Sequence, residues 1–461
     1  MKADHYRMTK TVSRSAISIA RAALALGVAL SLSACETLGI GGGDDKEDET
    51  PTLGNRQPIL SRIATEVVAD SALAGTAVVV PPAETNETWA QAGGTASKVS
   101  GHVTLSATPT RVWTAAIAGT TNTRRLAAAP VVAQGMVFAV DTSAVVHAFD
   151  AATGTPRWRH RIEVSGDLED ATFGGGASYS DGRIYATNGV GDVVALDAAT
   201  GNQIWRVKPG GPLRGAPTVA FNNVFVMTQD NQIFALAAED GDVNWQKAAA
   251  IGQQGVFGVA APAAGQGTVL AGFSSGELVA YRYENGRELW SDALARTSIS
   301  TQVGTLTDVD ADPIIDQGRV YALGQGGRMA AYELLTGQRI WELTLAGIST
   351  PTIAGEWVFT LTDDARILAI QRNSGRIRWM TQLDQWRDVK DKEGPIFWTG
   401  PVLASNRLWI ASSQGYVKSV DVMNGTVADL TQLEDGVTLP PVVANNMLYI
   451  LDDRGRIHAF R

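Results

Sequence analysis

The sequence predicts an all-β protein, an eight-bladed β-propeller whose blades each contain four strands. Three observations support this prediction: a short apolar motif recurs along the chain, a glycine turn follows it, and a tryptophan stands four residues beyond the glycine. All three occur together in GDVVALDAATGNQIW, from Gly191 to Trp205. Repeats of about 40 to 50 residues that supply four strands each are typical of propeller blades.

The motif consists of an apolar residue, a spacer, a small residue and a second apolar residue. Successive copies are 38 to 51 residues apart, which exceeds the period of most helical repeats. Strands that are apolar on both faces suit a sheet packed between two others. The eight copies begin at Val146, Val193, Ile233, Leu278, Met329, Ile367, Val417 and Ile457.

A glycine follows each of the first seven copies and indicates a tight turn. Glycine takes positive φ without a clash, and an Asp, Asn or Thr before it can hydrogen-bond to its own backbone. These glycines are Gly154, Gly201, Gly241, Gly286, Gly337, Gly375 and Gly425. The tryptophan side chains, large enough to fill a slot between stacked sheets, are Trp158, Trp205, Trp245, Trp290, Trp341 and Trp379.

The two ends of the chain are expected to complete the eighth blade. A second hairpin precedes each motif, as in Pro441 to Leu451, so that a full repeat supplies four strands. The last copy, at Ile457, has no tryptophan strand after it, whereas an unmatched tryptophan strand at Arg111 to Ile117 precedes the first copy. We expect the strand around Trp113 to join the three C-terminal strands, which removes free sheet edges.

Three regions are predicted along the chain. Residues 1–34 have a basic start and an apolar run typical of a secretory signal, shorter than the about 20 residues of a membrane-spanning helix. Residues 35–85 are expected to be a lipidated N-terminus and a flexible acidic tether, although apolar pieces between Arg56 and Pro82 leave open that this stretch packs on the propeller. Residues 86–461 are expected to form the propeller.

Leu32-Ser33-Ala34-Cys35 resembles a bacterial lipobox, in which the cysteine becomes the lipidated first residue after cleavage. Cys35 is the only cysteine of the chain, so no intramolecular disulfide or cysteine-based zinc site can form. The alternative is an ordinary signal followed by a cysteine through chance. Glu36 in the second mature position favours release to the outer membrane.

The charge of the mature chain argues against some classes of partner. The formal net charge is −9, and residues 1–34 carry +4, which leaves −13 for the remainder. An acidic body does not favour binding to nucleic acid or to an anionic membrane surface. Contact with a membrane is therefore expected through the lipid anchor only.

Signals of catalytic or metal chemistry are weak. Asp308, Asp310 and Asp312 alternate as at the start of an EF-hand loop, but the glycine and glutamate that complete such a loop are missing. His147 and His458 share a register in neighbouring blades, so they could approach one another or match only by chance. No nucleophile elbow, phosphate-binding loop or zinc-protease motif occurs. We expect no cofactor.

Three connections are longer than a blade needs: Val164 to Gly176, Ser291 to Asp312 and Gln382 to Gly400. Long loops on a rigid scaffold often carry binding sites.

A lipobox, an acidic tether and propeller repeats without catalytic motifs together resemble the BamB family, lipoproteins of the outer-membrane β-barrel assembly machinery. The similarity runs from the Trp-x-Gln-x-Gly-Gly of Trp89 to Gly94 to the end of the chain. Two local matches sharpen it: Leu-Arg-Gly at Leu213 to Gly215, before Ala-Pro, and Thr-Asp-Val-Asp at Thr307 to Asp310.

This resemblance implies a non-catalytic scaffold on the periplasmic face of the outer membrane that binds the POTRA region of BamA. Leu213 would be the apolar contact, Arg214 the cationic contact, and Asp308 and Asp310 the acidic contacts, all on exposed loops. The alternative, a surface salt bridge between the arginine and the aspartates, stays open. Gly211 replaces a leucine of the family pattern, which predicts a smaller contact.

A hypothesis from another class is a periplasmic oxidoreductase or sensor that binds pyrroloquinoline quinone or a metal. The repeat at Ala195 to Trp205 also resembles that of the quinoprotein dehydrogenases. Their calcium ligands and adjacent cysteines cannot be assigned in this chain. Whether unfolded outer-membrane proteins bind directly, and whether the central channel holds a ligand, stays open from the sequence.

Overall fold

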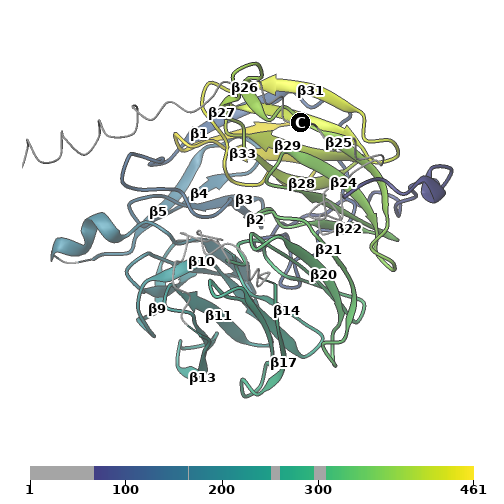
Figure 1. Ribbon diagram of the computed structural model, residues 1–461. Coiled ribbons are helices and arrows are strands. Elements are labelled where there is room, and N and C mark those ends of the chain that lie inside the picture. Colours follow the sequence, from purple (N-terminus) through teal and green to yellow (C-terminus); the bar gives the residue numbers. More distant parts are fainter. Residues whose placement is uncertain (1–66, 165, 251–259, 295–307) are drawn as a thin grey trace, which may run out of the picture. The chain divides into compact units, whose positions relative to one another are not determined.

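The structure is a computed structural model that describes residues 67–164, 166–250, 260–294 and 308–461. All of them belong to one compact unit that runs from Thr65 to Arg461. Eight four-stranded antiparallel sheets form the blades of a ring (Figure 1), which confirms the predicted eight-bladed propeller. No helix among the described residues is long and apolar enough to cross a membrane.

Seven blades are meanders in which the strands follow one another from an inner strand near the axis to an outer strand at the rim. Their strands are β2 (Val131–Ala133), β3 (Met136–Val140), β4 (Val145–Asp150) and β5 (Pro156–Arg161); β6 (Ala177–Ser180), β7 (Arg183–Thr187), β8 (Val193–Asp197) and β9 (Gln203–Val207); β10 (Leu213–Ala220), β11 (Asn223–Thr228), β12 (Gln232–Ala237) and β13 (Val243–Ala248); β14 (Ala263–Gly265), β15 (Thr268–Gly272), β16 (Glu277–Arg282) and β17 (Glu288–Ala293); β18 (Ile314–Asp316), β19 (Arg319–Gly324), β20 (Arg328–Glu333) and β21 (Arg339–Leu343); β22 (Thr352–Ala354), β23 (Trp357–Leu361), β24 (Arg366–Gln371) and β25 (Ile377–Gln382); and β28 (Trp398–Ala404), β29 (Arg407–Ser412), β30 (Tyr416–Asp421) and β31 (Val427–Gln432).

The eighth blade combines strands from both ends of the ring, as predicted. Its order is β1-β34-β33-β32, with β32 (Val442–Ala444), β33 (Met447–Leu451), β34 (Arg456–Phe460) and β1 (Arg111–Ala116). β1 pairs antiparallel with β34, and Trp113 lies opposite Ala459. Outside the blades lie the hairpin of β26 (Trp386–Asp388) and β27 (Glu393–Pro395) and two short 3-10 helices, η2 (Ser71–Leu73) and η3 (Gly166–Ala171).

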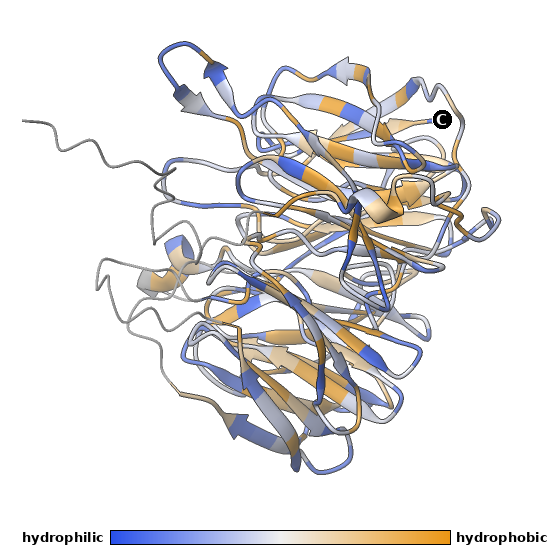
Figure 2. Cartoon of the chain, turned by 45° about the vertical axis from the view of Figure 1, so that its right-hand side comes forward, coloured by the Kyte–Doolittle hydropathy of each residue, from blue (hydrophilic) through white to orange (hydrophobic). Residues whose placement is uncertain are grey.

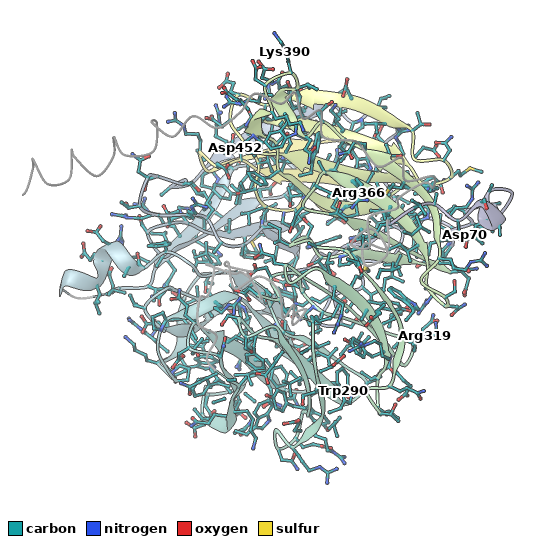
Figure 3. The ribbon with its side chains drawn as sticks, viewed as in Figure 1. Asp70, Trp290, Arg319, Arg366, Lys390 and Asp452 are labelled. Atoms are coloured by element: carbon teal, nitrogen blue, oxygen red, sulfur yellow. The ribbon has the colours of Figure 1, made fainter. Side chains whose placement is uncertain are left out.

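A tryptophan on the outer strand joins each of seven blades to the next. Trp290, labelled in Figure 3, donates its Nε1–H to the carbonyl oxygen of Leu334 at 2.7 Å. Its ring lies on Gly337, where an added Cβ atom would come within 2.5 Å of the ring. The turn glycine is therefore required both by its positive φ and by the neighbouring indole. The other donations run from Trp113 to Ala151, Trp158 to Ala198, Trp205 to Ala238, Trp245 to Tyr283, Trp341 to Arg372 and Trp379 to Val422.

One seam lacks this device, between the β28–β31 blade and the eighth blade. Asp429 stands four residues after Gly425, where the other blades have tryptophan, and pairs with Lys418 at 3.3 Å. The eighth blade has no turn between β34 and β1, because those strands come from opposite ends of the ring. The eighth blade therefore has no turn glycine of the kind that an indole covers at the other seams. The absence of this turn explains why the preceding blade needs no tryptophan at position 429.

Apolar residues concentrate in the inner and middle strands, whereas outer strands such as β5 and β13 are largely polar, as are the connections (Figure 2). The core consists of clusters between neighbouring blades; for example, Phe138 and Val146 of one blade pack with Ile184 and Leu196 of the next. The motif predicts blades that are apolar on both faces, and each of these faces packs against a neighbouring blade.

One end of the central channel is closed by residues 84–105, here called the floor segment. It hydrogen-bonds to the inner strands of seven blades. Trp89 pairs with Val132 on β2, and the carbonyl of Ala96 accepts from Ala264 on β14. The remaining contacts join Ala90 to Tyr179, Gln91 to Val219, Ser97 to Ile315, Val103 to Leu403 and Asn86 to Val443.

Residues 67–81 pack on the blade of β22–β25. Arg376 binds the Asp70 carboxylate at 2.6 Å, and the backbone N–H of Asp70 donates to the Ile377 carbonyl. Val78 is buried in the cluster that contains Trp357. Figure 3 labels Asp70 at this edge of the ring. Contact with the ring therefore begins upstream of residue 86, the predicted start of the propeller.

Candidate functional site

Among the described residues, the central channel is open at the end opposite the floor segment. β10 illustrates the geometry, because Val219 near its end contacts the floor and Arg214 lies at its start. The channel contains a cavity of about 890 Å³. Its wall is formed mainly by the connections that lead into the inner strands, and its base by the floor segment.

Leu213 and Arg214 lie at the start of β10, where a β-bulge interrupts the pairing with β11 between Arg214 and Thr218. Gly215 has φ +59° and contributes to this irregularity. A bulge re-aims the adjacent side chain. Leu213 is fully buried in the cluster that includes Phe234, whereas Arg214 leaves the blade.

Arg214 meets two aspartates that precede β18. Its Nη2 lies 3.0 Å from Asp308 Oδ1 and 3.4 Å from Asp310 Oδ1. The β14–β17 blade stands between the blades of β10 and β18. The Arg214 cluster, defined as Arg214, Asp308 and Asp310, therefore joins the start of β10 to the connection that leads into β18. The same connection is bonded to the intervening blade, because the Val309 N–H donates to the Phe273 carbonyl.

The Arg214 cluster holds one more acid than base. Burial and the charge of Asp308 raise the pKa of Asp310 to about 7, because together they outweigh the opposite effect of Arg214. Asp308 Oδ2 is buried and has no hydrogen-bond partner among the described residues. An unpaired buried acceptor of this kind favours a proton within the cluster.

The expected exposure of these residues is wrong. Leu213 and Asp308 have no exposed surface, and Arg214 and Asp310 keep only 5% and 7%. The two segments do lie together, and the arginine and the aspartates pair with each other. Their pair is buried rather than on the surface, because the β-bulge takes Arg214 out of regular pairing with β11 and the aspartates that it meets are themselves buried.

The other candidate residues have structural partners. His147 Nε2 lies 2.8 Å from Asp141 Oδ2, and His458 Nε2 lies 2.9 Å from Asp452 Oδ2, so each histidine pairs within its own blade. Of the three alternating aspartates, Asp308 and Asp310 pair with Arg214, and Asp312 accepts from the backbone of Ala261. Among the described residues, no three His, Cys, Asp or Glu side chains gather to hold a metal.

The long connections differ in what they form. Val164 to Gly176 contains η3, and Gln382 to Gly400 forms the β26–β27 hairpin. Lys390, at the tip of the hairpin, points away from the ring (Figure 3). Three predicted features lie outside the described residues. They are residues 295–307 of the Ser291 to Asp312 connection, Thr307 of the Thr-Asp-Val-Asp match, and Cys35.

A second pair of buried charges, at the base of the cavity, was not expected. Lys98 of the floor segment is 3% exposed and donates to Thr218 Oγ1 at 3.0 Å. Asp312 is 7% exposed and accepts from the backbone of Ala261 at 2.7 Å. The Trp-x-Gln-x-Gly-Gly pattern at the start of the floor segment was the only nearby signal in the sequence.

Known proteins resemble this chain in sequence. The model of the family described as outer membrane protein assembly factor BamB matches residues 99–171 and 142–381. The protein of that name from Vibrio cholerae is 30% identical over 352 residues, which cover 76% of this chain and 88% of the relative. The one from Yersinia pestis is 25% identical over 357 residues, with the same coverage, 76% and 88%.

Solved structures share the fold. BamB from Moraxella catarrhalis matches with a TM-score of 0.63 and 20% identity, over 77% of this chain and 99% of that chain. A quinohemoprotein alcohol dehydrogenase from Comamonas testosteroni matches with a TM-score of 0.64 and 14% identity, over 82% and 81%. At these identities the structural matches establish the propeller and nothing further.

Proposed function

The chain belongs to the family of the outer membrane protein assembly factor BamB, and from this premise we propose that it is a non-catalytic, lipid-anchored scaffold. As a member of this family it is a factor of outer-membrane protein assembly. Its likeness to the alcohol dehydrogenase is one of fold alone. The lipobox at Cys35 supports anchoring to the outer membrane, with the propeller on the periplasmic side.

We further propose that the corner of the ring around Leu213, Arg214, Asp308 and Asp310 meets the POTRA region of BamA. The observation that carries this proposal is the buried pairing of Arg214 with Asp308 across an intervening blade. Because these side chains are buried, they position the rim, and the exposed Pro212 and Gln229 beside them are available to the partner. The Gln229 N–H donates to the Pro212 carbonyl at 2.8 Å, which couples this rim to β10.

The test is recovery of BamA with the tagged full chain from solubilised membranes, together with the melting temperature of each variant. Arg214→Ala removes one partner of a buried ion pair, which typically costs about 3–5 kcal/mol, and should also abolish BamA recovery. A matched control is Arg372→Ala, because Arg372 is equally buried and pairs with Asp316 at 2.7 Å in another part of the ring.

The Arg372→Ala control should have a lower melting temperature but should still recover BamA. Equal recovery of BamA by both variants, with both folded and lipidated, would exclude this corner. The exchange Arg214→Asp with Asp308→Arg separates positioning from direct contact. If the exchange restores both the melting temperature and the recovery of BamA, the ion pair positions the rim. If it restores only the melting temperature, the side chains contact BamA directly.

A further inference from the structure

The central channel is a blind cavity. The floor segment closes one end through hydrogen bonds to seven blades, and the other end is open among those connections to the inner strands that the structure describes. Its volume of about 890 Å³ lies near the top of the roughly 300–1,000 Å³ range of ligand sites. A cavity of this size holds several amino-acid side chains.

The wall of the cavity is largely apolar. Its aromatic and proline residues are Trp89, Phe397, Trp398, Pro130, Pro351, Pro401, Pro440 and Pro441. Two apolar side chains at the mouth remain accessible to solvent, Phe397 at 57% and Ile348 at 45%. Exposed apolar side chains that continue into a concave apolar wall are typical of a binding site.

Polar groups inside the cavity retain hydrogen-bonding capacity. Lys98 and Asp312 form no ion pair with each other among the described residues, and each makes the single side-chain hydrogen bond given above. Gln325 lines the same cavity, and its Oε1 is buried without a hydrogen-bond partner among the described residues. A ligand that both donates and accepts hydrogen bonds would satisfy these groups.

The charge of the wall favours a cationic ligand. The carboxyls of Asp310, Asp312 and Asp453 line the cavity, together with the cations Lys98 and Arg125. Asp310 shares Arg214 with Asp308, so the cavity and the Arg214 cluster together hold one more acid than base. Burial raises the pKa of each of the three carboxyls, and a positive charge brought into the cavity would oppose this effect by stabilising their ionised forms.

We propose that the blind channel binds an extended segment of unfolded polypeptide that combines apolar side chains with a basic one. The apolar side chains meet the proline and aromatic wall, the backbone amides satisfy Lys98 and Gln325, and the basic side chain reaches the carboxyls. This inference deepens the proposed function by naming unfolded outer-membrane proteins as ligands of this cavity. It does not depend on contact with BamA.

The probes are two short synthetic peptides that alternate Phe, Thr and Ala around one central residue, Lys in one and Glu in the other. Binding to the full chain purified in detergent is measured by calorimetry. The Lys peptide should bind about tenfold more tightly than the Glu peptide, since only the former supplies a charge-assisted donor. Raising the pH from about 5 to about 8 should strengthen binding of the Lys peptide, because the carboxyls ionise.

Two variants locate the binding. Ser100→Trp fills the base of the cavity and should abolish binding of the Lys peptide. Phe397→Ser removes an exposed ring at the mouth, with little effect on folding, and should weaken binding several-fold. The matched control is Leu335→Ser, at a turn outside the channel where Leu335 is 67% exposed; it should bind the peptide as the unchanged protein does.

No binding of either peptide would overturn the proposal, as would equal binding of both peptides that survives Ser100→Trp and Phe397→Ser. Equal weakening by Phe397→Ser and Leu335→Ser would also overturn it, because such binding would depend on surface hydrophobicity alone. BamA recovery is measured with the same variants and should stay unchanged. A channel that does not bind peptide is thereby distinguished from a scaffold that does not bind BamA.

Discussion

At the scale of single residues, the Arg214 cluster is a buried group of charges with one more acid than base. One guanidinium serves two buried carboxyls, and an isolated buried charge is far more costly than a paired one. The pKa of Asp310, raised to about 7, means that this carboxyl holds its proton in the folded protein at pH values where it loses it in the unfolded chain. Folding stability from this group is therefore greatest at low pH and declines as the pH rises from about 4 towards 7.

Asp310→Asn should reduce this pH dependence, because the amide is neutral at every pH. The loss of unfolding free energy between about pH 5 and about pH 8 should be smaller in the variant by about 1–3 kcal/mol. Chemical denaturation at several pH values measures it. Asp312, Asp363 and Asp453 also have raised pKa values, so the comparison is with the unchanged protein at each pH. An identical slope in both proteins would contradict the assignment, and Asp391→Asn at the exposed hairpin tip is the control.

At the scale of elements, the repeat determined what could be predicted. Each tryptophan and each turn glycine recurs because the two residues contact each other between neighbouring blades. The contact therefore leaves a repeated signal in the sequence, from which the blades could be predicted. The floor segment has no repeat, and its bonds reach seven different inner strands, so nothing local identifies them. The burial of Arg214 was mispredicted for a related reason: the bulge after it and the span across an intervening blade are not encoded within the motif.

β1 is the element on which closure depends. Deletion of Arg111 to Ile117 would remove Trp113 from its place beside Tyr449 and leave β34 with an unpaired edge. Loss of one buried tryptophan typically costs about 3–5 kcal/mol, and the exposed edge adds to this. The variant should melt well below the full-length protein in calorimetry.

The matched control is removal of residues 389–392 from the tip of the β26–β27 hairpin, where Val389 is 75% exposed. That deletion should leave the melting temperature nearly unchanged. If both deletion variants have the melting temperature of the full-length protein, β1 does not close the ring.

At the scale of the whole molecule, we expect the chain to be held at the outer membrane by a lipid on Cys35. Cys35→Ser should abolish lipidation and leave the protein soluble or unprocessed. Sedimentation of membranes after cell lysis, followed by mass spectrometry of the N-terminus, measures this. An acylated, membrane-bound Cys35→Ser protein would show that the anchor is not at this cysteine. Ser33→Ala, which keeps the cysteine, is the control and should remain in the membrane fraction.

The pairing of β1 with β34 also governs when the protein can finish folding. It joins Arg111–Ala116 to Arg456–Phe460, almost the full length of the described chain. Contacts of such high contact order form slowly, because a long loop must close first. The predicted secretory signal leads the chain out of the cytoplasm from its N-terminus, so β1 is exported before β34 and waits without its partner until the other blades have followed. The unclosed ring is therefore the stage at which aggregation and proteolysis compete with folding, and the yield of the protein depends on how quickly its two ends meet.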